Sequence, residues 1–152
     1  MIDVTRASSL DAEIVVAIDR TCFREATVNL ENELKHPWSY VFLARPPKDD
    51  SARAFLLAWL VSDELHVLTV ATLPEFRRHG LARALLVHVI DFARSRGART
   101  VLLEVRRSNQ AALALYAAFG FATSRIRPRY YADNQEDAIE MTLALPPSNP
   151  EP

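Results

Sequence analysis

The segment Pro74–Leu86 combines residue types that bind an anion. Its sequence, PEFRRHGLARALL, places Gly80 after two arginines and a histidine and directly before an apolar helical pattern, in a chain with three glycines. The first N–H groups of a helix have no partner within it, and a glycine, which has no Cβ, lets an anion approach them. Arg77, Arg78 and Arg83 would add charged donors for a phosphate or pyrophosphate. The alternative is a loop glycine beside a solvated arginine face, because neither a P-loop nor a dinucleotide fingerprint is present.

Glu104 lies inside an apolar run, VLLEVR, that is typical of a buried strand. Burial of a carboxylate is costly without a partner, and apolar surroundings raise the pKa of a carboxyl group toward the range of a useful general base. The alternative is an ion pair with Arg106, which is two residues further on and therefore on the same face of the strand. The residues alone leave both interpretations open.

The remaining reactive side chains have simple structural explanations. Tyr116, in ALALYAAFGF, falls at the helical spacing of a core aromatic, and its hydroxyl needs a partner if it is buried. Cys22 is the single cysteine, so it forms no internal disulfide, and in VVAIDRTCF it is typical of a small buried apolar residue rather than a nucleophile. No metal site is predicted, because metal-ligand spacing is absent from the histidines His66, His79 and His88.

Length and composition indicate one globular domain. The chain has 152 residues, 49% of them hydrophobic, and we expect a single domain over residues 1–146 followed by a disordered, proline-rich tail at residues 147–152. The apolar runs are far shorter than the roughly 20 residues that span a bilayer, and the first residues do not follow the order of a signal peptide. These features predict a cytoplasmic protein with no membrane partner.

The charge is distributed unevenly along the chain. Residues 1–71 carry 7 basic and 11 acidic side chains, whereas residues 72–152 carry 11 basic and 8 acidic ones. The second half is therefore where an anionic ligand is expected. The arginines are dispersed, aromatic residues are not interleaved with them, and the sequence pI is about 6.4. These features argue against a nucleic-acid partner.

A mixed α/β chain must position these residues. Apolar runs rich in β-branched and aromatic residues predict strands at residues 1–7, 39–45, 52–62, 64–72, 100–105, 121–131 and 138–145. Helical spacing predicts helices at residues 8–23, 29–36, 81–96 and 108–120. Ser8 or Ser9 would cap the first helix and Ser108 the last. Strands 39–45, 52–62 and 64–72 suggest an antiparallel meander, and Gly80 falls between a strand and a helix.

The sequence around Gly80 resembles the Arg/Gln-x-x-Gly-x-Gly/Ala signature of the GCN5-related N-acetyltransferases, with Ala82 at its last position. Over about residues 64–145 the chain is similar to the bacterial ribosomal-protein alanine N-acetyltransferases, most specifically in LEVRRSNQAALALYAAFGF and in the ending R-x-x-YY…EDA-x-x-M. The resemblance implies the fold of that superfamily, which is a central, mostly antiparallel, twisted sheet of about seven strands flanked by about four helices.

The resemblance also implies roles for individual residues. Glu104 takes the position of the general base, and Tyr116 that of the tyrosine that protonates the thiolate of coenzyme A. Tyr130 and Tyr131 resemble the hairpin that walls the channel for the acceptor peptide. The co-substrate is acetyl-CoA, with no metal, and the residues implied to bind it are Val70, Ala71, Thr72, Arg77, Arg78, His79, Gly80, Leu81, Ala82, Arg83 and Asn109.

By the same resemblance we expect direct acetyl transfer, in a ternary complex, to the N-terminal α-amine of a protein, a ribosomal protein being one candidate. Two alternatives stay open: acetylation of a small amine or antibiotic, and a non-catalytic acyl-CoA-binding module, against which the presence of both Glu104 and Tyr116 argues. The segment CFREATVNLENELKH lacks a Pro-Trp-Ser that is common in the family, and this departure concerns the acceptor side. His36 and Trp38 belong either to that side or to a turn and the core.

Overall fold

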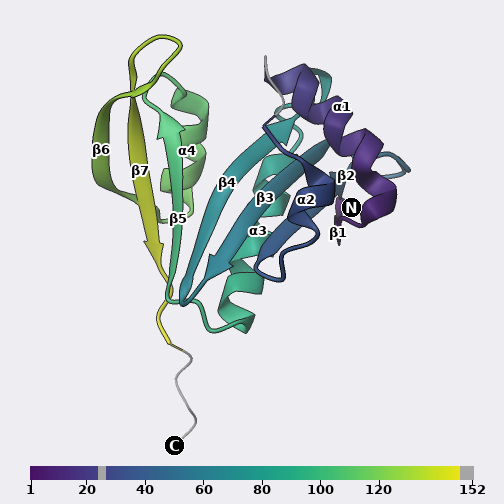
Figure 1. The fold of residues 1–152 in the computed structure, drawn as a ribbon, viewed down its shortest axis with the longest axis horizontal. Coiled ribbons are helices and arrows are strands. Elements are labelled where there is room, and N and C mark those ends of the chain that lie inside the picture. Colours follow the sequence, from purple (N-terminus) through teal and green to yellow (C-terminus); the bar gives the residue numbers. More distant parts are fainter. Residues whose placement is uncertain (24–26, 148–152) are drawn as a thin grey trace, which may run out of the picture.

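The protein is built on a twisted sheet of seven strands (Figure 1), as the computed structural model, which describes residues 1–23 and 27–147, shows. The strands are β1 (Asp3–Arg6), β2 (Ser39–Arg45), β3 (Ala54–Val61), β4 (Glu64–Thr72), β5 (Thr100–Arg106), β6 (Ala122–Tyr131) and β7 (Glu136–Ala144). Their order in the sheet is β1-β2-β3-β4-β5-β7-β6. The pair β4–β5 is parallel and the other neighbours are antiparallel. The predicted fold class and the meander β2-β3-β4 are confirmed, whereas most of the tail expected to be disordered, residues 148–152, lies outside the described residues.

Four α-helices accompany the sheet: α1 (Ala12–Cys22), α2 (Leu30–Glu33), α3 (Leu81–Ser95) and α4 (Gln110–Ala118). Ser8 and Asp11 form a capping box before α1. Of the two serines predicted as possible caps, Ser8 is therefore the one used. The prediction that Ser108 caps α4 is wrong by one residue, because the Asn109 side chain accepts the hydrogen bond from the N–H of Ala112 at 3.1 Å. In the described part of the chain, no helix is long and apolar enough to cross a membrane.

Helices cover both faces of strands β2 and β3. Successive side chains of a strand point to opposite faces, so Phe42 packs toward α3 while Leu43 packs toward α1. In Figure 1, α1 and α2 lie on one side of these strands and α3 on the other. Because both faces are buried, the runs SYVFLAR and AFLLAWLV are almost continuously apolar. This double-sided core is the rigid support on which the end of β4 and the start of α3 are held.

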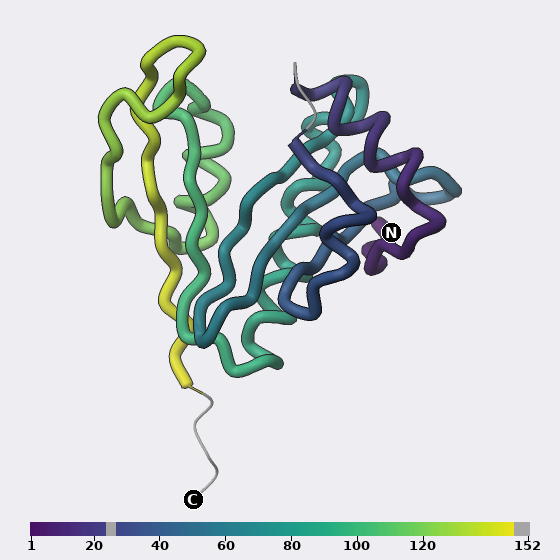
Figure 2. The backbone as a smooth tube through the Cα atoms, in the orientation of Figure 1, coloured from purple at the N-terminus to yellow at the C-terminus, as the bar shows by residue number. Residues whose placement is uncertain are grey.

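Strands β4 and β5 separate halfway along their length. They pair only from Glu64 to Val67 on β4, opposite Thr100 to Leu103 on β5. Leu68 follows immediately, and it is the extra residue of a β-bulge because Leu57 and Ala58 on β3 pair with Thr69 and Val67. A bulge bends its strand and increases the local twist. The two strands therefore diverge toward one end of the sheet, as Figures 1 and 2 show.

Candidate active site

The segment Arg77–Arg83, hereafter the Arg77–Arg83 loop, comprises the last residues of the connection between β4 and α3 and the first residues of α3. Gly80 is the N-cap of α3 and has φ = +85°, a left-handed conformation that glycine adopts without strain. No side chain caps this helix end, and the first turn of α3 contains no acidic residue. The cavity at this loop has a volume of about 330 Å³, which is large enough to receive part of a ligand.

The cations of the Arg77–Arg83 loop are not neutralised from within the protein. Among residues 1–23 and 27–147, no carboxylate lies within ion-pair distance of Arg77, Arg78 or Arg83. The Nε of Arg77 donates a hydrogen bond to the carbonyl of Thr72 at 3.1 Å, and the guanidinium of Arg83 lies over the ring of Phe119, 5.1 Å from its centre. Orphan helix N–H groups and uncompensated guanidinium groups together suit an anionic ligand.

The structure gathers most of the residues predicted to hold the co-substrate around this loop. Those that line its cavity are Thr72, Arg77, Arg78, Gly80, Leu81, Ala82 and Arg83. Val70 and Ala71 precede it on β4, on the side that β5 has left. His79 is exposed beside Gly80. Asn109 is the outlier, because its side-chain oxygen is used to cap α4.

A second cavity opens where β4 and β5 diverge, with a volume of about 350 Å³. We call it the Glu104 cavity. Leu68 and Glu104, the first residues beyond the paired part of each strand, both line it. The side chains that give it chemical character are Glu104, Arg127, Tyr130, Tyr131 and Glu140.

The expectation that apolar groups surround Glu104 is wrong. Its side chain is 33% exposed, and its Oε2 lies 2.8 Å from the Nε of Arg127 on β6. The alternative pairing with Arg106 is also wrong: both side chains lie on the same side of β5, but Arg106 turns toward the β6–β7 hairpin instead. The sequence correctly predicted that Glu104 and Arg106 lie on the same face of β5. It did not predict that Arg127 is the ion-pair partner of Glu104.

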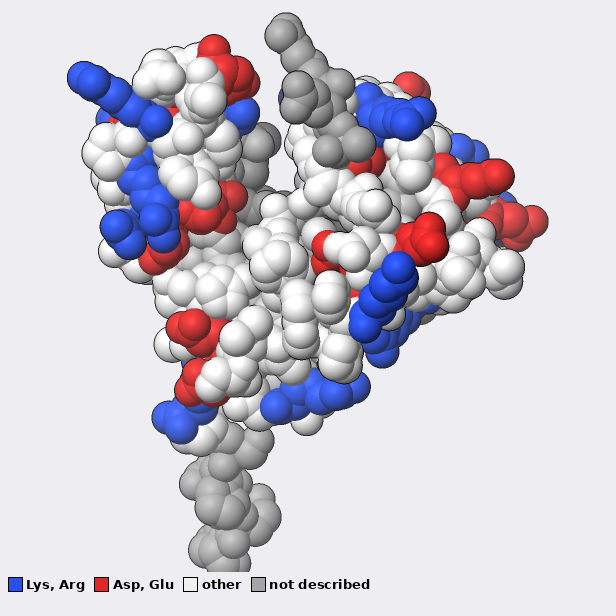
Figure 3. Space-filling model, in the orientation of Figure 1, with Lys and Arg blue, Asp and Glu red and all other residues white. Residues whose placement is uncertain are grey.

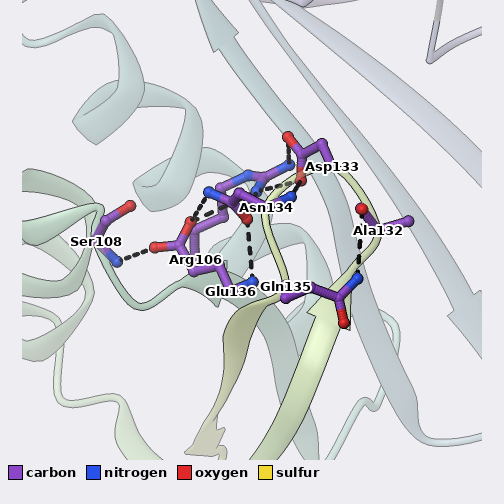
Figure 4. Close-up of polar contacts among 7 residues, drawn as sticks. All are labelled: Arg106, Ser108, Ala132, Asp133, Asn134, Gln135 and Glu136. Atoms are coloured by element: carbon purple, nitrogen blue, oxygen red, sulfur yellow. Dashed lines mark hydrogen bonds and ion pairs between the residues drawn. The ribbon is translucent and has the colours of Figure 1, made fainter.

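Arg106 anchors the β6–β7 hairpin to β5 (Figure 4). Its guanidinium lies 3.1 Å from Asp133 and 3.5 Å from Glu136, and Glu136 also accepts a hydrogen bond from the N–H of Ser108 at 2.6 Å. The hydrogen bond from Arg106 lowers the pKa of Asp133, and the hydrogen bond from Ser108 lowers that of Glu136. The same guanidinium stacks on the ring of Tyr131 at 3.9 Å.

Both tyrosines predicted for the acceptor side line the Glu104 cavity. Tyr131 is held by the stack on Arg106, and burial raises the pKa of its hydroxyl. Tyr130 packs edge-on against Tyr131, with 5.2 Å between ring centres, and remains half-exposed. The positions of both rings depend on an irregularity in the β6–β7 pairing between Arg127 and Tyr131.

Tyr116 lies apart from this cavity. Only 8% of it is exposed, it packs against Phe121 with 5.9 Å between ring centres, and burial raises the pKa of its hydroxyl to about 12. The hydroxyl therefore keeps its proton at neutral pH. The structure thus places Glu104 and Tyr116 in different environments, one beside a cation and one in the core.

Other candidate residues have structural explanations. Cys22 is partly buried, its Sγ donates to the carbonyl of Thr72 at 3.3 Å, and burial raises the pKa of the thiol, which agrees with its interpretation as a poor nucleophile. His36 stacks on Trp38 at 4.5 Å, Trp38 packs edge-on against Trp59, and neither His36 nor Trp38 lines the Glu104 cavity. Trp38 is 37% exposed, so the choice between an acceptor-side role and a structural role for this pair stays open.

Several residues that line the Glu104 cavity escaped prediction, and the most informative are Leu68, Arg127 and Glu140. Nothing local in the sequence marks Leu68 as a bulge, and Glu140 faces Glu104 only because of the β5–β7 register. Arg127 did carry a signal, since it is the arginine of the R-x-x-YY ending. No group of three or more potential metal ligands occurs within the part of the chain that the structure describes.

Comparisons with known proteins agree with this geometry. The profile of the acetyltransferase (GNAT) family matches residues 12–121. The [ribosomal protein bS18]-alanine N-acetyltransferase of Salmonella typhimurium is 46% identical over 99 residues, which are 64% of this chain and 67% of that relative. The Escherichia coli enzyme of the same name is 47% identical over 94 residues, or 60% of this chain and 64% of that relative. The chain thus spans about two thirds of the length of these relatives in the alignments.

The similarity to solved structures extends over the whole fold. The crystal structure of the ribosomal-protein-S18-alanine N-acetyltransferase from Escherichia coli superposes with a TM-score of 0.86 at 31% identity. That superposition covers 100% of this chain and 99% of the other. The whole fold of this chain is therefore similar to that of an N-acetyltransferase.

Proposed function

The chain belongs to the acetyltransferase (GNAT) family and is an N-acetyltransferase, and from this premise we propose that it transfers the acetyl group of acetyl-CoA to the N-terminal α-amine of a protein. A ribosomal protein is the first acceptor to test, because two relatives are named for the alanine of ribosomal protein bS18. The observation that carries the proposal is the Glu104 cavity, which combines a carboxylate with two aromatic walls at the divergence of β4 and β5. The proposal places the enzyme in the cytoplasm, where ribosomal proteins are made.

The Arg77–Arg83 loop fits the pyrophosphate of acetyl-CoA. Gly80 at φ = +85° opens a helix with uncapped N–H groups, and Arg78 and Arg83 have no carboxylate within ion-pair distance among the described residues. Helix N-termini and guanidinium groups both stabilise phosphate oxygens. The free edge of β4 from Leu68 to Thr72 would lie along the rest of the co-substrate.

Direct transfer needs a proton acceptor and a proton donor. Glu104 accepts the proton that the amine loses as its nitrogen bonds to the acetyl carbonyl carbon. Tyr116 gives its hydroxyl proton to the sulfur as the carbon–sulfur bond breaks, and its pKa of about 12 keeps that proton in place until then. Exchange with solvent returns both groups to their starting forms. Cys22 is not required, in agreement with the raised pKa of its thiol.

An α-amine suits this site better than a lysine side chain. The reference pKa of an α-amine is about 8 and that of a lysine about 10.4, so near neutrality roughly a tenth of α-amines are already nucleophilic. For lysines the fraction is well below about one in a thousand. A weak general base such as Glu104 is then sufficient for an α-amine. A cavity walled by Tyr130 and Tyr131 also admits a chain end more readily than a side chain from the middle of a folded segment.

The test uses a lysine-containing peptide in two forms, free and acetyl-blocked at its N-terminus, with Ala, Ser, Met or Gly as the first residue of the free form. Acetyl-CoA is the donor, and mass spectrometry locates the added group. We expect acetylation of the free α-amine alone. Equal or faster reaction of the blocked peptide at its lysine would overturn the proposal. Failure of all peptides together with reaction of a small polyamine or aminoglycoside would favour a small-molecule acetyltransferase.

A further inference from the structure

Two carboxylates lie side by side in the Glu104 cavity. In the antiparallel β5–β7 pair, Glu104 is directly opposite Glu140. Residues directly opposite in such a pair point to the same face, with their Cβ atoms only about 5 Å apart, and like charges there repel. The side chain of Glu140 is 19% exposed, so water screens this repulsion only in part.

Arg127 bridges the two carboxylates from the neighbouring strand β6. Its Nε lies 2.8 Å from Oε2 of Glu104, and its Nη2 lies 3.6 Å from Oε2 of Glu140. A third contact comes from the hydroxyl of Ser124, which donates to Oε1 of Glu140 at 2.9 Å. Oε1 of Glu104 accepts no hydrogen bond within the described residues, so one oxygen of the proposed base remains available to an acceptor amine.

No other lysine or arginine can replace Arg127 within the described lining of the cavity. His66, from β4, is the other basic residue there, and it lies 3.3 Å from Glu64. The hairpin contributes Tyr130 and Tyr131 to the lining and no further lysine or arginine. Arg106, behind Tyr131, is already held by Asp133 and Glu136. Arg125 is directly opposite Glu140 on β6, but it does not line the cavity and makes no ion pair with Glu140 among the described residues. Arg127 is therefore the cation that contacts both carboxylates.

The Arg127 guanidinium is itself incompletely satisfied. Its Nε is buried, and although Glu104 is close, the N–H is not aligned with that oxygen or with any other acceptor in the described residues. A buried N–H without an aligned acceptor is uncommon in folded proteins. The contact is an ion pair without a well-formed hydrogen bond, and a small rotation of either side chain would complete it.

We propose that Arg127 is a positioning residue for acetyl transfer, which bridges Glu104 and Glu140 so that Glu104 stays ionised and oriented toward the acceptor amine. The proposal rests on Glu104 being the base, as argued above. It predicts that loss of the guanidinium affects the step that needs a deprotonated carboxylate and leaves acetyl-CoA binding unchanged.

The decisive variant is Arg127→Gln, measured by the pH dependence of kcat/KM with the fastest peptide of the panel described above. Without the cation, two facing carboxylates resist being ionised together, so protonation occurs at higher pH. We expect the acidic limb of the profile to move up by about one pH unit. Arg127→Lys, which keeps the charge, should restore the limb toward its wild-type position, and KM for acetyl-CoA should not change.

The double variant Arg127→Gln/Glu140→Gln separates electrostatics from folding. Glu140→Gln removes the second carboxylate and with it the repulsion of Glu104. The acidic limb of the kcat/KM profile should therefore return toward its wild-type position, although both Arg127 and Glu140 have been replaced. Arg94→Gln is the control, because Arg94 is an exposed arginine on α3 that pairs with Asp91 at 3.5 Å and does not line the Glu104 cavity. A purely structural role would instead lower the melting temperature and kcat of Arg127→Gln without moving the limb, and that result would overturn the proposal.

Failure of the base assignment would look different. If Glu104→Gln keeps near-normal turnover, Glu104 is not the base, and the role of Arg127 falls with that assignment, whereas the acceptor proposal is decided by the peptide panel alone. If Glu104→Gln is inactive but the limb of Arg127→Gln does not move, only the role of Arg127 is wrong. If no peptide reacts, carbon-13 NMR of the glutamate carboxyl groups tests the role of Arg127 instead. Glu104 and Glu140 should then titrate at higher pH in Arg127→Gln than in the wild type, and unchanged titrations would refute the proposal.

Discussion

The Arg77–Arg83 loop and the β5–β7 region both contain several arginines, but they use the charge in opposite ways. In the loop, no arginine has a carboxylate within ion-pair distance among the described residues. In the β5–β7 region, Arg106 pairs with Asp133 and Glu136, Arg107 with Asp137, and Arg127 with Glu104 and Glu140. Figure 3 shows this mixture of basic and acidic atoms on the side formed by β6 and β7.

The difference shows that a count of charges does not locate a ligand. The second half of the chain has an excess of basic residues, yet three arginines of the β5–β7 region are paired with carboxylates of the protein, and Arg106 fixes the hairpin in this way. Arg125 and Arg129 on β6 have no carboxylate within ion-pair distance among the described residues. The arginines of the loop have no such partner among the described residues, which suits the anionic co-substrate proposed above. The proposed co-substrate site and the proposed acceptor site therefore do not share their cations.

The largest effect, on acetyl-CoA binding, is expected from Gly80→Val in the Arg77–Arg83 loop. A β-branched residue is strained at φ = +85° and would place its side chain where a phosphate must meet the backbone. Within the protein the new Cβ meets only Ile2, at 3.6 Å. We expect acetyl-CoA binding to be abolished, measured by calorimetry on a folded sample.

Gly97→Val is the matched control for that variant. Gly97 lies just past the other end of α3 and has φ = +77°, and a Cβ added there would meet no atom of the described residues within 4 Å. The variant should lose a similar amount of stability, about 1–2 kcal/mol, but keep its affinity for acetyl-CoA. Equal affinity in both variants would mean that the loop is not the phosphate site.

Glu104→Gln should affect catalysis at the Glu104 cavity and leave the Arg77–Arg83 loop unchanged. Loss of a proton-transfer group typically lowers turnover by about 10²–10⁴-fold, and we expect this range for kcat with unchanged affinity for acetyl-CoA. The measurement is steady-state peptide acetylation together with calorimetry. Near-normal turnover across the pH range would show that Glu104 only pairs with Arg127 and takes no part in the chemistry.

Tyr116→Phe is expected to lower turnover by about 10²-fold, because the ring that packs against Phe121 is retained and only the donated proton is lost. Tyr40→Phe is its control, since Tyr40 is another buried tyrosine of the same core. If both variants lose activity equally, the hydroxyl of Tyr116 has no special role as an acid.

A smaller effect separates the free cations from the paired ones. Arg78→Gln should raise KM for acetyl-CoA by roughly tenfold, which corresponds to about 1.4 kcal/mol, and this effect should shrink at high salt. Arg107→Gln removes an arginine that pairs with Asp137 and is 69% exposed, and it should leave KM unchanged. The comparison between the two regions fails if both variants change KM alike.

The smallest effect concerns the acid stability of the hairpin. Contacts with Arg106 and Ser108 hold the pKa values of Asp133 and Glu136 below their ordinary values of 3.8 and 4.5. A lowered pKa in the folded state contributes stability above the ordinary value, and this contribution is lost as pH falls through the folded-state value. Thermal melts should therefore show a decline below about pH 4.5 that is shallower, by a few degrees at most, in Arg106→Gln. An identical decline in both proteins would show that the network adds nothing.

Much of the fold could be predicted because its signals are local. The range of β4 was predicted without error, and the end of α3 at Gly97 followed from a glycine after basic residues. The predicted helix at residues 29–36 is a single turn, Leu30–Glu33. Its position follows from Asn29 as N-cap, but its length depends on what packs against it, and periodicity over eight residues cannot resolve that.

The sequence by itself determined the order of the elements, the glycine at the start of α3 and the placement of Glu104 and Arg106 on one face of β5. These properties depend on spacing of two to four residues, on capping and on backbone preferences. Only the tertiary structure decided that Glu104 pairs with Arg127, that Glu140 stands opposite it, and that Arg106 holds the hairpin. Those pairings depend on the register of β7 against β5 and on the bulge after Arg127, because a shift of one residue along a strand turns every side chain to the other face.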